Sequence, residues 1–186
     1  MTEFTRDRAW ALVQNYVPED SPLRKHCLAV EAVMRHHARA ANQDEEEWGL
    51  VGLLHDFDYD RYPQDHPLQG MRILREQGLP EPLVLACGSH GHLGIPRDDR
   101  LRQTLYAVDE MSGFVVAVAL VRPGRSLTDV DGKSVRKKMK DKAFARAVNR
   151  DDLLDGAALL GVGFDEHVGN VVEGLRPVAS LFGLDQ

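Results

Sequence analysis

The sequence predicts an all-α protein that folds as a single-domain bundle of seven to nine helices. Nearly every segment repeats its apolar residues with the 3.6-residue period of a helix, and almost none shows the alternation of a strand. Prolines, glycines and polar capping residues mark the ends of these segments. A length of 186 residues and a hydrophobic content of 43% suit one domain with a real core.

The first two predicted helices are separated by proline. Residues 3–17 carry an apolar face in helical register that stops at Pro18. The second helix is expected to open at Ser21, a good N-cap, with Pro22 at its first position, and to run to about residue 41. His26 lies on or beside the apolar face of this helix.

The third helix is expected to begin at Asp44 and to end near a histidine–aspartate pair. Asp44 and Glu47 have the spacing of a capping box, and acidic residues suit a helix N-terminus. The apolar sequence that follows leads directly into His55 and Asp56. Residues 58–65 are predicted to form a loop.

Two short helices are expected next. The fourth starts at His66 and closes at Gly78, which can serve as a C-terminal cap. The fifth opens at Pro80. Because residues 88–94 are rich in glycine, His90 is expected near the end of this helix.

The longest helix is expected at residues 98–121, with Asp109 on its inner side. Residues 122–133 are predicted to form a loop, and a basic helix should follow at residues 134–149. The last two helices are expected at residues 151–160 and 165–182. We expect residues 1–125 to form a metal-binding helical core, and residues 126–186 to form a helical elaboration packed on it.

Composition excludes several classes of protein. A net charge of -6 argues against a general nucleic-acid binder, because affinity for phosphates needs a basic face. The N-terminus lacks the pattern of a signal peptide, and the longest apolar run, residues 114–121, is too short to cross a membrane. A cytoplasmic location is therefore expected. Cys27 and Cys87 are predicted to be buried free thiols, and residues 115–120 to lie in the core or in a homodimer interface.

Polar residues that could bind a metal follow an apolar run. Four large aliphatic residues lead into His55 and Asp56, and both side chains would be costly to bury without a partner. Histidines and an aspartate from other segments can complete a site at the centre of a bundle, because each helix aims only one or two side chains there. Imidazole and carboxylate suit divalent manganese, iron, cobalt, nickel, zinc or magnesium. The predicted ligands are His26, His55, Asp56, His66, His90 and Asp109.

Four of these ligands resemble the metal-binding pattern of the HD-domain superfamily of phosphohydrolases. In that family a histidine, a consecutive His-Asp doublet and a later aspartate hold a divalent cation in an all-α core. Here the matching residues are His26, the doublet His55 and Asp56, and Asp109. The resemblance covers about residues 20–122. It implies that residues 1–125 form an HD domain with a metal site in the bundle core.

A second element resembles the two-metal, HDIG-like branch of the superfamily. His66 and Pro67, followed by Gly70, are similar to its His-Pro-x-x-Gly element, and His90 stands where that branch has a further ligand. The resemblance implies that Asp56 bridges two ions, of which the second is held by His66 and His90. The sequence departs from that branch after the doublet, where Phe57-Asp58-Tyr59 replaces Ile-Gly-Lys. Another cation would then have to contact the phosphate in place of that lysine, and a cyclic dinucleotide substrate is not assigned.

The implied activity is hydrolysis of a phosphoester in a small phosphorylated metabolite or nucleotide by a metal-activated hydroxide. His92, Asp58 or Asp60 could relay a proton or orient the water beside His55 and Asp56. The cations considered for substrate binding are Arg61, Arg72, Lys133 and Lys137, with Arg136 and Lys138.

Other interpretations stay open. A di-iron oxygenase, a minority activity of the same superfamily, could use the same ligands, and so could a metal-binding regulatory module without catalysis. The basic run 133–142 is more simply a solvated helix face, with Lys133 and Ser134 as its best functional candidates. His36 and His37 are expected to have surface or packing roles, and His167 to be solvated.

Overall fold

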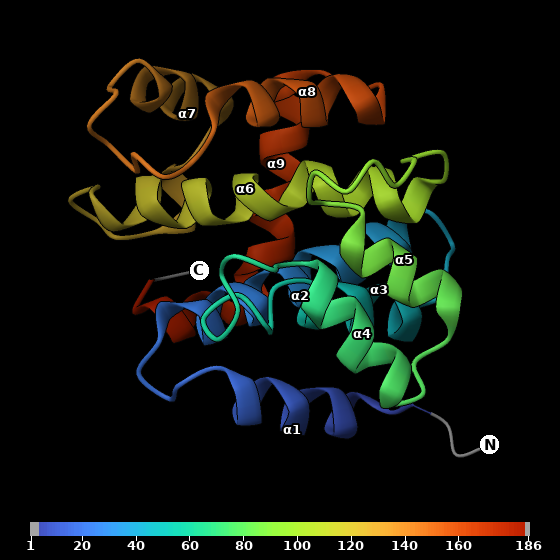
Figure 1. The fold of residues 1–186 in the computed structure, drawn as a ribbon. Coiled ribbons are helices and arrows are strands. Elements are labelled where there is room, and N and C mark those ends of the chain that lie inside the picture. The colour runs from blue at the N-terminus through green and yellow to red at the C-terminus, as the bar shows by residue number, and fades with distance from the viewer. Residues whose placement is uncertain (1–3, 185–186) are drawn as a thin grey trace.

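The computed structural model describes residues 4–184 (Figure 1) and confirms the all-α prediction. This part of the chain contains nine α-helices and two 3-10 segments and no β-strand. The α-helices are α1 (Arg6–Tyr16), α2 (Pro22–Ala40), α3 (Glu45–Leu54), α4 (Leu68–Glu76), α5 (Glu81–Gly88), α6 (Arg100–Leu120), α7 (Gly132–Met139), α8 (Arg150–Leu160) and α9 (Phe164–Leu175). The 3-10 segments are η1 (Leu127–Asp129) and η2 (Arg176–Phe182).

Helix starts follow the capping residues of the sequence. The side chain of Ser21 accepts a hydrogen bond from the Leu23 amide at the start of α2, and Asp44 accepts from two amides at the start of α3. Gly78 has φ 84°, which a glycine adopts readily, and it follows the end of α4. The predicted first helix includes residue 3, which lies outside the described residues, and α1 begins at Arg6 behind the cap Thr5.

Close packing of α2 against α3 creates the first half of the site. A Cβ atom at Gly52 would lie 2.8 Å from the carbonyl oxygen of Val30, so only glycine allows the two backbones to approach this far. This approach brings His26 of α2 beside His55, which directly follows α3. Their ring centroids lie 5.2 Å apart.

The long helix α6 crosses the middle of the molecule (Figure 1). In that view α2 and α3 lie on one side of α6, and α7 and α8 lie on the other. Helix α9 runs past α6 and joins the two sides, and its His167 donates from Nε2 to the Ala107 carbonyl at 2.9 Å. The prediction that His167 is solvated is therefore wrong, because its side chain is 0% exposed between these helices.

The predicted basic helix 134–149 is also wrong in its second half. Helix α7 ends at Met139, and residues 141–147 form turns. The guanidinium of Arg150 holds these turns by donating to the carbonyl oxygens of Asp141, Phe144, Ala145 and Val148. The turns carry Ala147 and Val148 to the cavity described below.

The last predicted helix is shorter than expected. Residues 165–182 were expected to form one helix, but α9 ends at Leu175 and a 3-10 segment continues to Phe182. Pro177 lacks the amide hydrogen that an α-helical turn would need at this point. Other expectations are confirmed: Cys27 and Cys87 are free and buried, and Val115, Val118 and Ala119 lie in the core. None of the described helices is both long and apolar enough to cross a membrane.

Candidate metal centre

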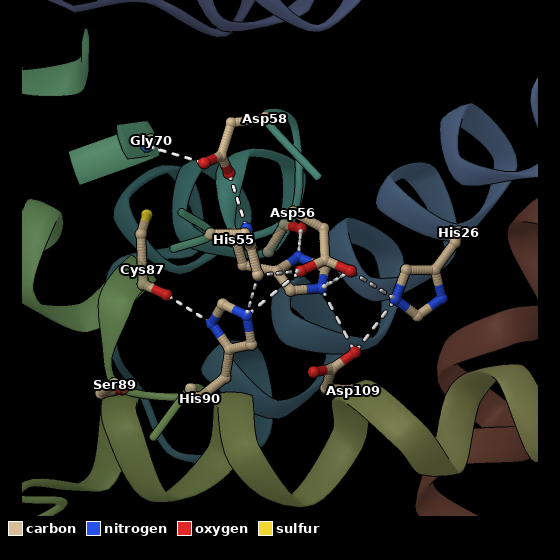
Figure 2. Close-up of polar contacts among 12 residues, drawn as sticks. His26, His55, Asp56, Asp58, Gly70, Cys87, Ser89, His90 and Asp109 are labelled. Carbon is tan, nitrogen blue, oxygen red and sulfur yellow. Dashed lines mark hydrogen bonds and ion pairs between the residues drawn. The ribbon is translucent and has the colours of Figure 1, made fainter. Parts of the chain in front are cut away.

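Two groups of donor atoms meet between α2, α3, α5 and α6. The first group comprises His26, His55, Asp56 and Asp109, whose donor atoms all lie within 4.8 Å of one another. Oδ1 of Asp109 lies 3.0 Å from Nε2 of His26 and 3.2 Å from Nε2 of His55. Oδ2 of Asp56 lies 3.8 Å and 3.5 Å from the same two nitrogens. Figure 2 shows these side chains pointing toward one another from α2, from the end of α3 and from α6.

The end of α3 explains how neighbouring residues converge. Successive side chains on a regular helix point about 100° apart, which would separate His55 from Asp56. Helix α3 ends at Leu54, however, so His55 is its C-cap and Asp56 already belongs to the turn that follows. The sequence thus places the doublet where the chain leaves the helix, and both side chains reach the same space.

The second group comprises Asp56, His66 and His90. Oδ1 of Asp56 lies 3.1 Å from Nε2 of His66 and 3.1 Å from Nε2 of His90, and these two nitrogens are 3.0 Å apart. Asp56 therefore directs one carboxylate oxygen at each group, and Figure 2 shows it between His26 and His90. The six ligands predicted from sequence all come together in these two groups.

The outer nitrogens of three histidines are fixed by acceptors that lie behind them. Nδ1 of His55 donates to the Gly52 carbonyl at 2.8 Å, and Nδ1 of His90 donates to the Cys87 carbonyl at 2.6 Å. Nδ1 of His66 lies 2.8 Å from Oδ1 of Asp58. Because a carbonyl oxygen only accepts, His55 and His90 must carry their proton on Nδ1. Such outer partners fix the tautomer and orientation of metal-binding histidines.

Asp58 is a positioning residue rather than part of the cavity wall. Its side chain is 0% exposed, and Oδ2 accepts from the Gly70 amide at 2.7 Å. A Cβ atom at Gly70 would lie 2.6 Å from Oδ1 of Asp58, so glycine is needed for this contact. The chain between α3 and α4 thus folds back so that Asp58 contacts both His66 and Gly70 and fixes the position of the His66 imidazole.

The donor set fits a divalent cation. With their protons on Nδ1, His55 and His90 turn the lone pair of Nε2 toward carboxylate oxygens, and lone pairs facing one another at about 3 Å repel unless a positive charge lies between them. Nitrogen and oxygen donors of this kind suit borderline or hard divalent metals. Four donors would hold one ion, and three donors, one of them from the shared Asp56, would hold another.

The pKa values of these groups also indicate that the site favours positive charge between its donors. Burial opposes a charged His66, but hydrogen bonds to Asp56 and Asp58 outweigh it and raise its pKa to about 9. Burial likewise opposes charge on His55, yet the carboxylates of Asp56 and Asp109 raise its pKa well above the ordinary value. The pKa of Asp56 and that of Asp109 are lowered by the neighbouring histidines, in spite of burial. Without a metal, protons supply the positive charge that this arrangement favours.

A cavity of about 480 Å³, the metal cavity, opens beside these donors. Its wall carries the carboxylates of Asp56, Asp109, Glu110 and Asp152, and within residues 4–184 no lysine or arginine lines it. Burial and the neighbouring Asp109 raise the pKa of Glu110 to about 7. The remaining lining residues are His26, Tyr59, His66, Pro67, His90, Gly91, His92, Leu93, Tyr106, Ala147 and Val148.

The other predicted site residues fall in several places. His92 lines the metal cavity, and Asp60 bonds the hydroxyl of Ser21 on the surface. The structure does not bring the predicted substrate-binding cations to this cavity. Arg61 lies over the ring of Tyr16, and Arg72 is exposed on α4. Lys133, Lys137 and Lys138 line a different pocket, and Arg136 pairs with Asp165.

Sequence reasoning missed four polar residues of the cavity wall, which are Tyr59, Tyr106, Glu110 and Asp152. Tyr106 and Glu110 are four residues apart on α6, about one helical turn, and Asp109 lies between them. This spacing could have identified both as lining the same space as Asp109. Asp152 comes from α8 and accepts a hydrogen bond from the Tyr106 hydroxyl at 2.8 Å. No pattern around Asp152 relates it to α6, because the contact depends on how α8 packs.

The fold and this site define an all-helical domain in which histidines and aspartates from several segments form two groups that could hold a metal ion. Residues 23–113 match the family model described as HD domain, and this part of the chain belongs to the HD-domain superfamily. HD domains bind divalent metals, and the family suggests a metal-dependent phosphohydrolase.

One curated relative is "Uncharacterized protein MJ0778" of Methanocaldococcus jannaschii. It is 32% identical over 101 residues, which cover 51% of this chain and 59% of the relative. The matched region thus spans a little more than half the length of that protein. No solved structure matches the chain significantly.

Proposed function

We propose that this protein is a metal-dependent phosphohydrolase that cleaves a phosphoester of a small phosphorylated metabolite or nucleotide at a two-ion site. The observation that carries the proposal is that the two carboxylate oxygens of Asp56 face different donor groups. Its Oδ2 faces the first group and its Oδ1 faces the second. A carboxylate shared in this way suits a pair of ions about 4 Å apart, as found in many phosphatases.

Each side chain has a distinct role in this proposal. His26, His55, Asp56 and Asp109 would hold the first ion, and Asp56, His66 and His90 would hold the second. When bound, such cations lower the pKa of water and neutralise charge on phosphoryl oxygens. Asp58 keeps His66 in position. The carbonyls of Gly52 and Cys87 keep His55 and His90 in position, respectively.

The charge of the metal cavity supports a narrower class of substrate. Asp152 adds negative charge to the wall, as does Glu110 where the pH exceeds its raised pKa of about 7, and within the described part of the chain no lysine or arginine lines the cavity to offset it. Phosphate charge would then be balanced by the bound cations alone. We therefore propose a phosphomonoester whose remaining part is neutral, hydroxyl-rich or cationic, because a polyphosphate would meet like charges there.

His92 is the side chain that we assign to proton transfer. It lines the cavity from the loop after α5 and is exposed to solvent. An imidazole can both accept and donate a proton, as cleavage requires when the leaving oxygen must be protonated. Glu110 and the Tyr106–Asp152 pair face the same cavity and can orient hydroxyl groups of the substrate.

Elemental analysis of the purified protein, combined with a screen of phosphorylated compounds, tests this function. The proposal predicts up to two divalent ions per chain and phosphate release from at least one small monoester. Iron at two per chain with consumption of oxygen would instead identify an oxygenase. Bound metal without turnover across a broad panel would contradict catalysis and leave a regulatory module.

A further inference from the structure

A second cavity of about 440 Å³ lies between the C-terminal end of α6 and α7. We call it the cationic pocket, and it is lined by Val118, Val121, Arg122, Pro123, Asp131, Lys133, Ser134, Lys137 and Lys138. It shares no lining residue with the metal cavity. Its volume falls in the range typical of pockets for small molecules.

Four cations and one carboxylate line this pocket. The carboxylate, Asp131, is already used, because it accepts from the Ser134 amide at 2.8 Å and caps α7. In the described part of the chain, none of the four cations forms a salt bridge. By contrast, Arg136 on the opposite face of α7 pairs with Asp165 of α9. The positive charge of α7 that forms no ion pair is thus gathered on the face that lines the pocket, where Lys138 also lies over the ring of Phe144.

Arg122 adds a buried donor to this charge. Its Nε atom is buried and has no hydrogen-bond partner, whereas buried polar atoms are generally paired. An unpaired buried donor is destabilising, and the side chain that carries it lines the pocket. The pocket therefore offers an anion a guanidinium from the end of α6 as well as ammonium groups from α7.

The pattern of α7 directs these ammonium groups to one place. Lys133 and Lys137 are four residues apart, as are Ser134 and Lys138, so all four lie on one face of the helix. The neighbouring Lys140 and Lys142 are exposed and do not line the pocket. Within the basic run, Lys133, Lys137 and Lys138 therefore line the pocket, although Lys133 and Lys137 remain exposed to solvent.

The pocket is remote from the metal centre. Val118, which lines it, lies nine residues beyond Asp109 on α6, about 14 Å along the helix axis at 1.5 Å per residue. A phosphate held by Lys133 and Lys137 would not reach the donor groups of the metal centre. Any ligand of this pocket would act as an effector or an anchor rather than as the substrate.

We propose that the cationic pocket binds a small polyanion carrying two or more phosphate groups, such as a nucleoside triphosphate or inorganic tripolyphosphate. Four cations in one concave site match several phosphate charges better than a single one. A nucleic acid or a membrane surface would need a broad basic face, which a chain with a net charge of -6 offers less well. This inference does not depend on the proposed hydrolase activity.

Calorimetric titration of the full chain with inorganic tripolyphosphate tests the inference. The protein is first stripped of metal and the chelator removed, so that the metal centre cannot contribute. We expect binding of one ligand per chain that weakens as salt is added. The double variant Lys133→Ala with Lys137→Ala should bind at least about tenfold more weakly, because two charge-assisted contacts are removed.

A matched control removes the same charge outside the pocket. Lys140→Ala with Lys142→Ala should bind as the wild type does, and Arg122→Gln should bind more weakly. The inference is overturned if no saturable binding occurs, or if the two double variants lose affinity equally. Tighter binding of RNA or anionic lipid vesicles than of tripolyphosphate would also overturn it. Since metal-free protein is used, none of these results bears on hydrolysis.

Discussion

The metal cavity and the cationic pocket have similar volumes but opposite chemistry. Helix α6 contributes to both, with Asp109 near its middle and Val118 near its end. In the metal cavity, carboxylates and imidazoles from several helices face one another and are largely buried. In the cationic pocket, lysines of one helix face solvent without ionic partners. The protein therefore separates the positive charges of the cationic pocket from the donor groups of the candidate metal centre.

This separation indicates how each of the two cavities could bind a phosphate. A cavity that concentrates carboxylates attracts cations first and binds anions only through them. A cavity lined with unpaired lysines and arginine attracts anions directly, and that attraction weakens with salt. The two sites should respond differently to metal, to charge substitutions and to ionic strength.

The largest effect is expected from Asp56→Asn, which should reduce turnover at least about a thousandfold. The amide keeps the shape of the side chain but removes the charge shared by both donor groups, so metal binding is lost with activity. Phosphate release, elemental analysis and circular dichroism check this result. Asp60→Asn, an exposed aspartate outside the cavity, is the matched control. Undiminished turnover in Asp56→Asn would remove the doublet from the mechanism.

A smaller effect on the same region is expected from Gly70→Ala. The added methyl group would lie 2.6 Å from Oδ1 of Asp58 and push it away from His66. The affinity for the second ion should fall about 10- to 100-fold, the range seen when such outer partners are removed. Metal titration should show stoichiometry moving from two toward one, as in His66→Ala. Gly169→Ala, where no atom lies within 4 Å of the new methyl group, should titrate like the wild type.

The charge of the metal cavity is tested by Glu110→Gln. This variant removes one carboxylate from the wall, which reduces repulsion. It should improve kcat/KM a few-fold for phosphomonoesters whose remaining part is anionic, relative to those whose remaining part is neutral. The ratio of the two kcat/KM values is the measurement. Glu19→Gln, on an exposed surface outside the cavity, provides the control. An unchanged ratio would show that the wall charge does not select substrates.

The smallest effect is expected from Lys133→Ala with Lys137→Ala on hydrolysis itself. Both lysines line the cationic pocket, so the kinetics of a phosphomonoester should stay within about twofold of the wild type at constant salt. Steady-state kinetics check this expectation. A tenfold rise in KM would contradict this expectation. It would support the substrate-binding role for which these lysines were considered from the sequence.

The grouping of the six candidate residues could be predicted from a local feature of the sequence together with a family pattern. His55 and Asp56 stand out directly after an apolar helix, and the spacing of His26 and Asp109 from them matches a known family pattern. The six residues then converge in two groups, as that pattern implies. Helix positions were predicted for the same reason, since caps such as Ser21 and Asp44 act on neighbouring amides.

Other features could not be predicted because they depend on contacts between distant segments. His167 resembles an exposed residue in sequence, yet packing places it against the Ala107 carbonyl. The turns after α7 are held by hydrogen bonds from the Arg150 guanidinium to their carbonyl oxygens. No local sequence pattern predicts these bonds. Asp152 reaches the metal cavity only because α8 packs beside α6. The walls of a cavity are therefore less predictable than its ligands.

Anomalous diffraction from crystals of the manganese-loaded protein tests the central claim most directly. The account predicts two anomalous peaks, one contacted by His26, His55, Asp56 and Asp109, and one contacted by Asp56, His66 and His90. A single peak in the first group would keep the metal centre but remove the two-ion mechanism. The absence of any peak within bonding distance of both His55 and Asp109 would contradict the account.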